Sequence, residues 1–440
     1  MSIMSELAVP SLVDLRKKLA RAVQRLQPQA ESLLAEIVRI PSISGHERAV
    51  VRRVAHWARA RSFSVDVFET DEESLADFAE IAAGHLPLKG RPTLVIRHPG
   101  RERGRSLLFN AHSDVVAAPE PEHWRHGPWS GFIARGRLYG RGACDSKGPL
   151  VSALLAMQAL REIAADSDTR HGDILLELVP GEEDCVGLGT LTSLIRGYRA
   201  DAVVILEPTD GQPRCASRSG LRFRITVAGR AVHGTLKWLG RDAIADLRRV
   251  LAALEQMERK FNRKKSNHLF DDYPFLRPIT VDQLKGGSWP GMVCDQALCA
   301  GYFELLPEDD VFVWKRRFQR ELAQRLGKTF AAGGIKTDFI EEYSGHATAP
   351  EHPLCRLAER ILQINERKLA WKGWKAFNSG CEAGLRWRRQ GVPTLVWGPG
   401  SLEQAHAVDE FVDLTAVRDT AVYLALLAYY WTRERDKENS

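Results

Sequence analysis

Histidine and carboxylate side chains follow four apolar runs of the sequence, each at the point where the run ends. SLLFN leads to His112, ILLELVP to the pair Glu182 and Glu183, AVVIL to Glu207, and TLVWGPG to the segment that holds His406. In an open α/β sheet, ligands bind outside the carboxyl ends of the strands. Imidazole and carboxylate groups that converge there form the donor set of a metal site. The order of these residues therefore predicts a metal centre at one edge of a sheet.

A further carboxylate, Asp145, lies in a fifth segment, the glycine-rich LYGRGACDSKG, just before an expected helix. Aspartate is favoured at helix N-caps, so a purely structural role stays open for this residue. The surrounding glycines let the backbone wrap closely around the carboxylate, which a cap does not require. The other groups also have plain alternatives: a packed histidine, solvated glutamates and a Glu-Pro turn. Their joint occurrence at strand ends favours the metal site.

These runs belong to an alternation of strands and helices. TLVIRH, SLLFNAHSD, DILLELVP, AVVILEP and TLVWGPG have the length and apolar content of buried strands. PLVSALLAMQALREIA and TAVRDTAVYLALLAYYW have the character of helices, and another helix is expected from about Pro28 to Ile40. The alternation predicts an α/β fold with a mostly parallel central sheet flanked by helices.

The stretch between these blocks follows a different order. LRFRITVAG alternates as a half-exposed strand does, and DAIADLRRVLAALEQMERKF has the period of an amphipathic helix. ALCAGYFELLP, VFVWKRRFQRELAQRLGK and KTDFIEEY then continue as strand, helix and strand, whereas NRKKSNHLFDDYP reads as a loop. The pattern predicts a small α+β domain at residues 217–343, inserted into a discontinuous metal-binding domain at 1–216 and 344–440.

Composition restricts the class of protein. The chain has 440 residues, enough for two domains, and its 44% hydrophobic and 27% charged residues are typical of a folded, soluble protein. No apolar run reaches the roughly 18 residues that a membrane helix needs, and the first residues lack an apolar signal core. The seven cysteines are an odd number without zinc-finger spacing, so we expect a reducing cytoplasmic location.

The net charge of +6 is too small for a chain of this length to indicate nucleic acid binding. Part of the excess lies between Arg218 and Arg249, where eight Arg or Lys residues accompany two Asp residues. Two interpretations stay open for this segment: a solvated face, or a surface that attracts an anionic substrate.

Six segments together resemble one family of enzymes. NAHSDVV, LYGRGACDSKG, PGEED, ILEPTD, GRAVHGT and GPGSLEQAHAVDEFV are similar to segments of the co-catalytic zinc hydrolases that include acetylornithine deacetylase, succinyl-diaminopimelate desuccinylase, aminoacylase and glutamate carboxypeptidase. The resemblance extends from about Glu31 to Leu427, and it leans toward the acetylornithine deacetylase branch.

The resemblance implies a dinuclear metal site. One divalent ion would be held by His112 and Glu207, the other by Glu183 and His406, and Asp145 would bridge the two. Carboxylate and imidazole donors suit Zn²⁺, with Co²⁺ or Mn²⁺ as alternatives.

The same resemblance implies the roles of two further residues. Asp114 would hydrogen-bond the nitrogen of His112 that the metal leaves free, which fixes the tautomer of the ring. Glu182 would act as general base toward a metal-activated water and pass the proton to the leaving nitrogen.

The expected reaction is hydrolysis of an amide bond, with an N-acyl amino acid or related N-acylated amine as the substrate. A dipeptidase or carboxypeptidase, and an aminopyrimidine deformylase, are the alternatives on the same scaffold. A non-catalytic, metal-stabilised binding protein is the alternative of another class, and the intact Glu182 speaks against it.

The inserted segment resembles the lid of the family, which also carries the dimer contact. His233 in GRAVHGT corresponds to the lid histidine, which acts in the active site of the partner subunit and stabilises an oxyanion. The resemblance therefore implies a homodimer formed through the inserted domain.

One part of the lid departs from the family pattern. Relatives carry an asparagine and, on a later strand, an arginine that bind a substrate carboxylate. The corresponding positions in GGSWPGMVCDQALCAGYFELLP are Gly291 and Glu304. We therefore do not expect the usual arginine to bind a carboxylate, and we expect Glu304, or Glu382 in FNSGCEAGL, to meet a cationic or amino-bearing substrate.

Overall fold

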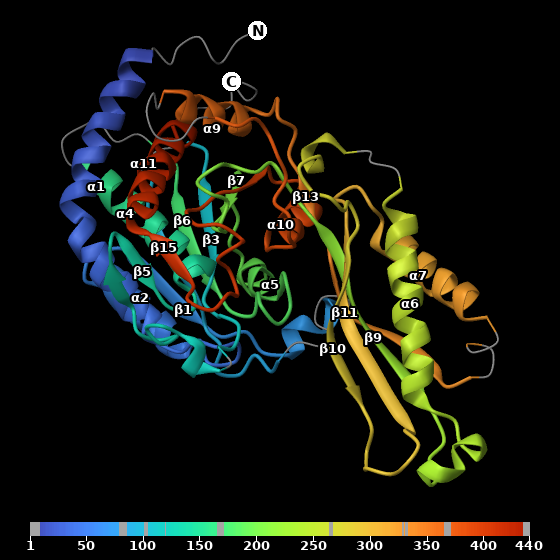
Figure 1. The fold of residues 1–440 in the computed structure, drawn as a ribbon. Coiled ribbons are helices and arrows are strands. Elements are labelled where there is room, and N and C mark those ends of the chain that lie inside the picture. The colour runs from blue at the N-terminus through green and yellow to red at the C-terminus, as the bar shows by residue number, and fades with distance from the viewer. Residues whose placement is uncertain are drawn as a thin grey trace.

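A computed structural model describes residues 9–78, 86–100, 104–118, 120–164, 171–263, 267–327, 330, 333–364 and 371–433. Figure 1 shows two bodies, a larger one built on a central sheet and a smaller one that extends from its side. We call the smaller body the lid. None of the helices in the described ranges combines the length and the apolar character that crossing a membrane requires.

The central sheet has six strands in the order β1-β2-β6-β3-β7-β14. Their bounds are Ser64–Phe68 (β1), Thr93–His98 (β2), Ile174–Val179 (β6), Leu107–His112 (β3), Ala202–Ile205 (β7) and Thr394–Val396 (β14). The neighbours β6, β3, β7 and β14 are parallel, whereas β2 runs antiparallel to both β1 and β6. The predicted mostly parallel central sheet is therefore confirmed.

Helices cover both faces of this sheet (Figure 1). On one face, α1 (Val9–Val38), α4 (Gly148–Ala164) and α11 (Leu414–Trp431) pack against one another and against Phe109. On the other face, α10 (Ala383–Gln390) shares a core with Leu108 and contacts α5 (Leu188–Ile195). Helices α2 (Arg48–Arg59) and α9 (Pro353–Gln363) complete the larger body. Alternate residues of β3 thus enter opposite cores, as the period of a strand requires.

The first helix is longer than the sequence pattern predicted. We expected it to begin near Pro28, but α1 begins at Val9 and Pro28 lies inside it. Leu12, Leu19 and Val23 are buried at helical spacing and bind the earlier turns to the core.

In the residues that the structure describes, the lid comprises a four-stranded antiparallel sheet in the order β10-β11-β9-β12 and two α-helices. Its elements are β9 (Ser219–Ala228), α6 (Ala243–Phe261), β10 (Ile279–Gly286), β11 (Gln296–Leu305), α7 (Val311–Leu326) and β12 (Ile335–Tyr343). Strand β10 was missed in the sequence, because this edge strand is largely exposed and carries no apolar run. The segment expected to be a loop holds a short 3-10 helix at His268–Phe270, and its residues 264–266 lie outside the described ranges.

The lid sheet has two different faces. Leu221, Phe223 and Ile225 of β9 enter a core with α6 and α7, on the side away from the larger body (Figure 1). Arg222 alternates with them and so points to the side that faces the larger body. Strands β8 (Ala216–Ser217) and β13 (His346–Ala347) pair where the chain enters and leaves the lid. Among the described residues, the strands of the lid pair only with one another. This supports the proposal that residues 217–343 form a separate inserted domain.

Candidate metal centre

The parallel strands bring the predicted ligands to one edge of the central sheet. His112 is the last residue of β3, and Glu182 and Glu183 follow β6 in the loop that leads to α5. Glu207 follows β7, and His406 lies in the long loop after β14. Since these four strands are adjacent and parallel, their carboxyl ends open on the same side of the sheet.

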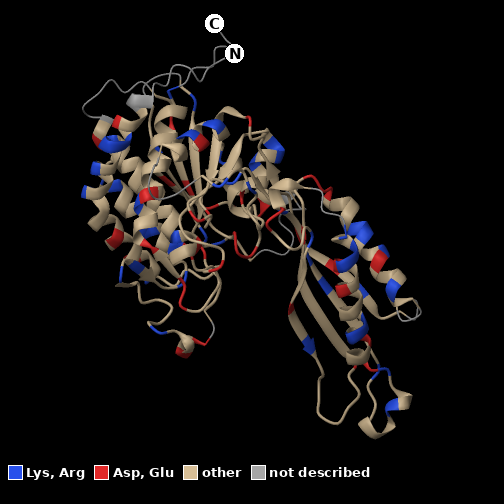
Figure 2. Ribbon diagram, turned by 45° about the horizontal axis from the view of Figure 1, so that its top comes forward, with Lys and Arg blue, Asp and Glu red and all other residues tan. Residues whose placement is uncertain are grey.

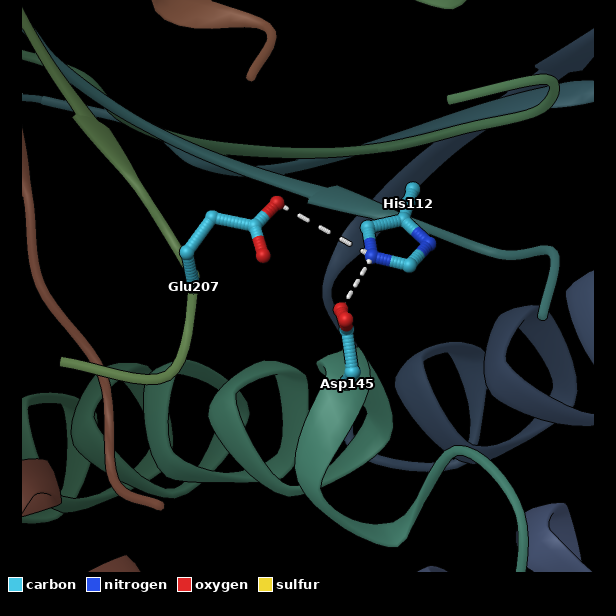
Figure 3. Close-up of side chains that lie close together, drawn as sticks. All are labelled: His112, Asp145 and Glu207. Carbon is cyan, nitrogen blue, oxygen red and sulfur yellow. Dashed lines mark hydrogen bonds and ion pairs between the residues drawn. The ribbon is translucent and has the colours of Figure 1, made fainter. Parts of the chain in front are cut away.

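Asp145 lies between the two histidines. Its Oδ1 is 2.9 Å from Nε2 of His112, and its Oδ2 is 3.5 Å from Nε2 of His406. Nε2 of His112 is also 3.8 Å from Oε1 of Glu207, and Figure 3 shows both carboxylates pointing at the imidazole. On the other side, Nε2 of His406 is 3.1 Å from Oε2 of Glu183.

Two groups of potential ligands therefore share one carboxylate. The first is His112, Asp145 and Glu207, and the second is Asp145, Glu183 and His406. Within each group, the ligand atoms lie within 4.8 Å of one another. The carboxylate of Asp145 could therefore contribute to two cation sites, one in each group.

The electrostatics of the site also fit cations. Burial raises the pKa of Glu182 and of Glu207 well above the usual range, against the charge of His112, and neighbouring carboxylates raise both further. Burial raises the pKa of Glu183 as well. In the described part of the chain, none of these glutamates forms an ion pair with Lys or Arg. Buried carboxylates that lack a Lys or Arg partner favour a bound positive charge.

The two imidazoles respond to this negative environment. Hydrogen bonding to Glu183 raises the pKa of His406 to about 9, against the effect of burial. Burial would lower the pKa of His112, but the hydrogen bond to Asp145 and the charge of Glu207 hold it well above its usual value. Burial would raise the pKa of Asp145, and its contact with His112 keeps that pKa low.

The carboxylate of Asp114 does not act as predicted. Nδ1 of His112 lies 2.9 Å from the backbone carbonyl oxygen of Asp114, whereas the carboxylate Oδ1 is 3.8 Å away. The carboxylate instead accepts the backbone N–H groups of Gly181, Glu182 and Glu183 at 3.0–3.2 Å. It therefore holds the loop that carries the two glutamates, and the tautomer of His112 is set by a backbone oxygen.

A buried arginine holds the next residue of that loop. Arg91 donates to Asp184 and lies 2.7 Å from Oε1 of Glu47, and both Arg91 and Glu47 are buried. Asp114 and Arg91 thus hold four consecutive residues of this loop, Gly181 to Asp184. None of these anchoring contacts of Arg91 was predicted from the sequence.

A second pair that the sequence did not single out joins the loops of Asp145 and His406. Glu410 accepts the backbone N–H groups of Cys144 and Asp145 at 2.9 and 3.1 Å. It also forms an ion pair with Arg141 at 2.7 Å. Arg141 also donates to the backbone oxygen of His406 at 3.1 Å. Both residues lie inside the segments that carry the family resemblance, which was the available signal.

Comparison with known proteins decides the family of this site. The model of peptidase family M20/M25/M40 matches residues 108–430, a range that contains all the predicted ligands. The chain belongs to this family.

Family M20 relatives cover most of the chain. This chain is 26% identical over 361 residues to N-formyl-4-amino-5-aminomethyl-2-methylpyrimidine deformylase of Halalkalibacterium halodurans. The alignment covers 78% of this chain and 82% of the relative. The chain is 25% identical to acetylornithine deacetylase of Pasteurella multocida, over 88% of this chain and 92% of the relative. The structure of the dipeptidase Dug1p from Saccharomyces cerevisiae matches with a TM-score of 0.76 and 15% identity, over 96% and 99% of the two chains. The fold prediction and the predicted family are confirmed, and this M20 chain is a metal-dependent hydrolase of amide bonds.

Two other residues predicted to belong to the site of this M20 chain, His233 and Glu382, lie outside the two ligand groups. His233 is exposed on the lid, where its Nδ1 is 2.7 Å from Oγ1 of Thr235. The 3-10 helix that follows it, Gly234–Leu239, lies at the far end of the lid from the larger body (Figure 1). His233 therefore does not join the ligand groups of its own chain in this conformation.

The carboxylate of Glu382 is engaged elsewhere. It is buried and accepts the backbone N–H groups of Gly187 and Thr190, both at 2.9 Å, at the start of α5. Glu304 on β11 accepts the hydroxyl of Tyr343 at 2.5 Å, and burial raises its pKa to about 7. These contacts do not support our expectation that Glu382 meets a cationic substrate, because both of its oxygens already serve the backbone of α5.

Proposed function

We propose that this enzyme uses two divalent ions to hydrolyse the amide bond of an N-acyl amino acid, in the manner of acetylornithine deacetylase. The observation that carries the proposal is the position of Asp145, with one oxygen toward His112 and the other toward His406. The similarity to acetylornithine deacetylase along nearly the whole chain supports the substrate class.

The ligand groups support one ion held by His112, Asp145 and Glu207, and a second held by Asp145, Glu183 and His406. Their nitrogen and carboxylate donors suit Zn²⁺, and Co²⁺ or Mn²⁺ would also fit. When bound, the ions would supply the Lewis acidity that activates water and polarises the amide carbonyl.

In this proposal Glu182 is the general base. It accepts a proton from the attacking water at its carboxylate and delivers that proton to the leaving nitrogen. Two features support this role. Glu182 is held beside the ligands by the carboxylate of Asp114, and burial raises its pKa, so that it can hold a proton between the two steps.

The second candidate function is deformylation of an aminopyrimidine. It is favoured by the similarity to the deformylase of Halalkalibacterium halodurans, whose identity of 26% is close to the 25% of the deacetylase, over 78% of this chain against 88%. The two substrates differ in one group that a binding site can recognise, because an N-acyl amino acid has a carboxylate and the pyrimidine has none.

We further propose that the enzyme is a homodimer formed through the lid. Large apolar side chains are exposed on the lid around its edge strand β10: Trp289 is 73% exposed, Trp238 72% and Leu284 58%. An edge strand with exposed apolar neighbours is suited to pairing with a second copy. In such a dimer His233 would reach the active site of the partner.

The cysteines support a reducing compartment, and we propose the cytoplasm. All seven are free and buried, so none contributes a disulfide to the fold.

The experiment that tests the function measures metal content and turnover together. Protein reconstituted with Zn²⁺ should bind about two ions per chain, as two ligand groups predict. It should hydrolyse acetylornithine or a related N-acyl amino acid in preference to the formylaminopyrimidine and to dipeptides. One ion per chain at saturation would contradict the bridging role of Asp145, and preference for the pyrimidine would select the second candidate.

A further inference from the structure

We propose that Arg222 on the lid binds the carboxylate of the substrate, in place of an arginine at position 304. This inference rests on the proposed function, since it assigns a binding group to the N-acyl amino acid. It would also decide between the two candidate substrates, because only one of them carries a carboxylate.

The register of the lid sheet places Arg222 on an inner strand, on the face turned toward the larger body. Arg222 on β9 lies opposite Tyr302 on β11 and opposite Glu341 on β12. Its flanking residues Leu221 and Phe223 are buried in the core with α6 and α7, so the guanidinium points the other way. Its Cζ lies 5.3 Å from the centre of the Tyr302 ring, which supports it as a platform.

This face lies against the loop that carries the catalytic glutamates. Oε1 of Glu341 accepts the backbone N–H of Val186 at 2.9 Å, four residues after Glu182. Burial raises the pKa of Tyr302, and the charge of Glu341 on the same face raises it further. In Figure 2, acidic segments of the larger body likewise gather on the side that faces the lid. A substrate bound at the metal centre would therefore extend toward Arg222.

Arg222 lacks the partners that buried arginines usually have. It is half-buried, yet within the described ranges it forms no ion pair, and its buried Nε has no hydrogen-bond partner. Two carboxylates on the neighbouring strands have other partners: Glu341 accepts the backbone N–H of Val186, and Glu304 accepts the hydroxyl of Tyr343. A carboxylate would stabilise a partly desolvated guanidinium that has no acceptor, because the guanidinium can bind it through two parallel hydrogen bonds.

Arg218, the other arginine at this end of β9, cannot take this role. It is fully buried and donates to the backbone oxygen of Phe275 and to Oδ1 of Asn378 at 2.9 Å. Its donors are already satisfied by the protein. Arg224, two residues beyond Arg222 on the same face, is exposed and provides a matched control.

The test compares an N-acetyl amino acid with its carboxamide, which differs only in lacking the negative charge. With the wild-type enzyme we expect the acid to be preferred. Arg222→Met should raise KM for the acid by roughly 10- to 100-fold, the usual worth of a charged hydrogen bond, with little change in kcat or in KM for the carboxamide. For Arg222→Lys, the KM for the acid should lie between those of the wild type and Arg222→Met. For Arg224→Met, it should match the wild type.

Binding of a non-hydrolysable N-sulfonyl amino acid and its carboxamide, measured by calorimetry, separates the two proposals. If the acid binds in an Arg222-dependent way but no N-acyl amino acid is turned over, the proposed reaction fails and the role of Arg222 stands. If N-acyl amino acids are hydrolysed but Arg222→Met binds and hydrolyses acid and carboxamide as the wild type does, Arg222 is not the carboxylate receptor. A loss of kcat on both substrates, or an equal effect of Arg224→Met, would also overturn the proposal.

Discussion

Arg141 and Glu410 form a buried ion pair, with 2.7 Å between Nη1 and Oε2, that joins the two loops of the candidate metal centre. Glu410 accepts a hydrogen bond from the backbone N–H of Asp145, and Arg141 donates one to the backbone oxygen of His406. His406 needs this support, because its side chain is 52% exposed and its backbone has a φ of 61°, which is uncommon for a residue other than glycine.

We predict that Glu410→Gln weakens the metal site on the His406 side more than the site on the His112 side. The amide can still accept the N–H of Asp145 but loses the charge that holds Arg141. Residues that orient metal ligands typically contribute about 10- to 100-fold to metal affinity. Titration with a competing chelator should show one ion per chain released at lower chelator concentration than in the wild type.

The chain offers a matched control for this variant. Arg386 and Glu177 form another ion pair in which both side chains are fully buried, and neither contacts a proposed ligand. Glu177→Gln should lower the melting temperature, because it leaves a buried charge unpaired, while both ions keep their affinity. Equal loss of metal in the two variants would mean that Glu410 acts only through general stability.

We predict that Glu182→Gln abolishes turnover and leaves metal binding nearly intact. The amide keeps the shape of the side chain but cannot accept the proton, and general bases contribute about 10²- to 10⁴-fold. Glu183→Gln is the companion variant and should lose metal on the His406 side, since Glu183 contacts that histidine. If Glu182→Gln loses metal as Glu183→Gln does, the roles of the two glutamates are reversed.

The sequence predicted the parts of the site that depend on strand ends. His112 and Glu207 follow short apolar runs, and buried parallel strands necessarily bring such residues to one edge. The backbone contacts of the Asp114 and Glu382 carboxylates were not predicted. Both carboxylates accept backbone N–H groups of the loop at 181–190, and the course of a loop backbone is not encoded in any periodic pattern.

The contacts of Glu410 show the same limit over a longer range. Its partner Asp145 is 265 residues away, and nothing in the local sequence links the two. Strand β10 was missed for another reason, since an edge strand with an exposed surface lacks the apolar alternation by which strands are recognised.

We predict that His346 makes the protein sensitive to acid. Burial lowers the pKa of this histidine to about 3, against about 6.5 in an unfolded chain. Because the unfolded state binds the proton first, the free energy of unfolding falls as the pH drops from about 6.5 toward 3, by up to about 1.4 kcal/mol per pH unit. His346→Gln should make this decline shallower in urea denaturation series at several pH values. The exposed His123→Gln serves as control, and parallel declines in both variants would refute the assignment.

The last prediction concerns His233 in the proposed dimer. The backbone N–H of Thr235 donates to Nδ1 of His233 at 3.3 Å, so the proton of the neutral ring lies on Nε2. That nitrogen is then a donor, as stabilisation of an oxyanion requires. Removal of one such donor costs about 10²- to 10³-fold in rate. His233→Ala should therefore slow turnover by about that factor while both ions remain bound.

Mixing His233→Ala with Glu182→Gln tests whether the histidine acts across the interface. In a mixed dimer, the site with intact Glu182 would receive the intact His233 of the other chain. After complete exchange of equal amounts, half the dimers are mixed and each has one complete site, so activity should return to about a quarter of the wild-type value. If the histidine acts within its own chain, every site in the mixture lacks one residue and no activity returns. Continued inactivity after exchange is proven by labelled subunits, or full activity of a monomer, would refute action in trans and leave the assignment of the metal ligands unchanged.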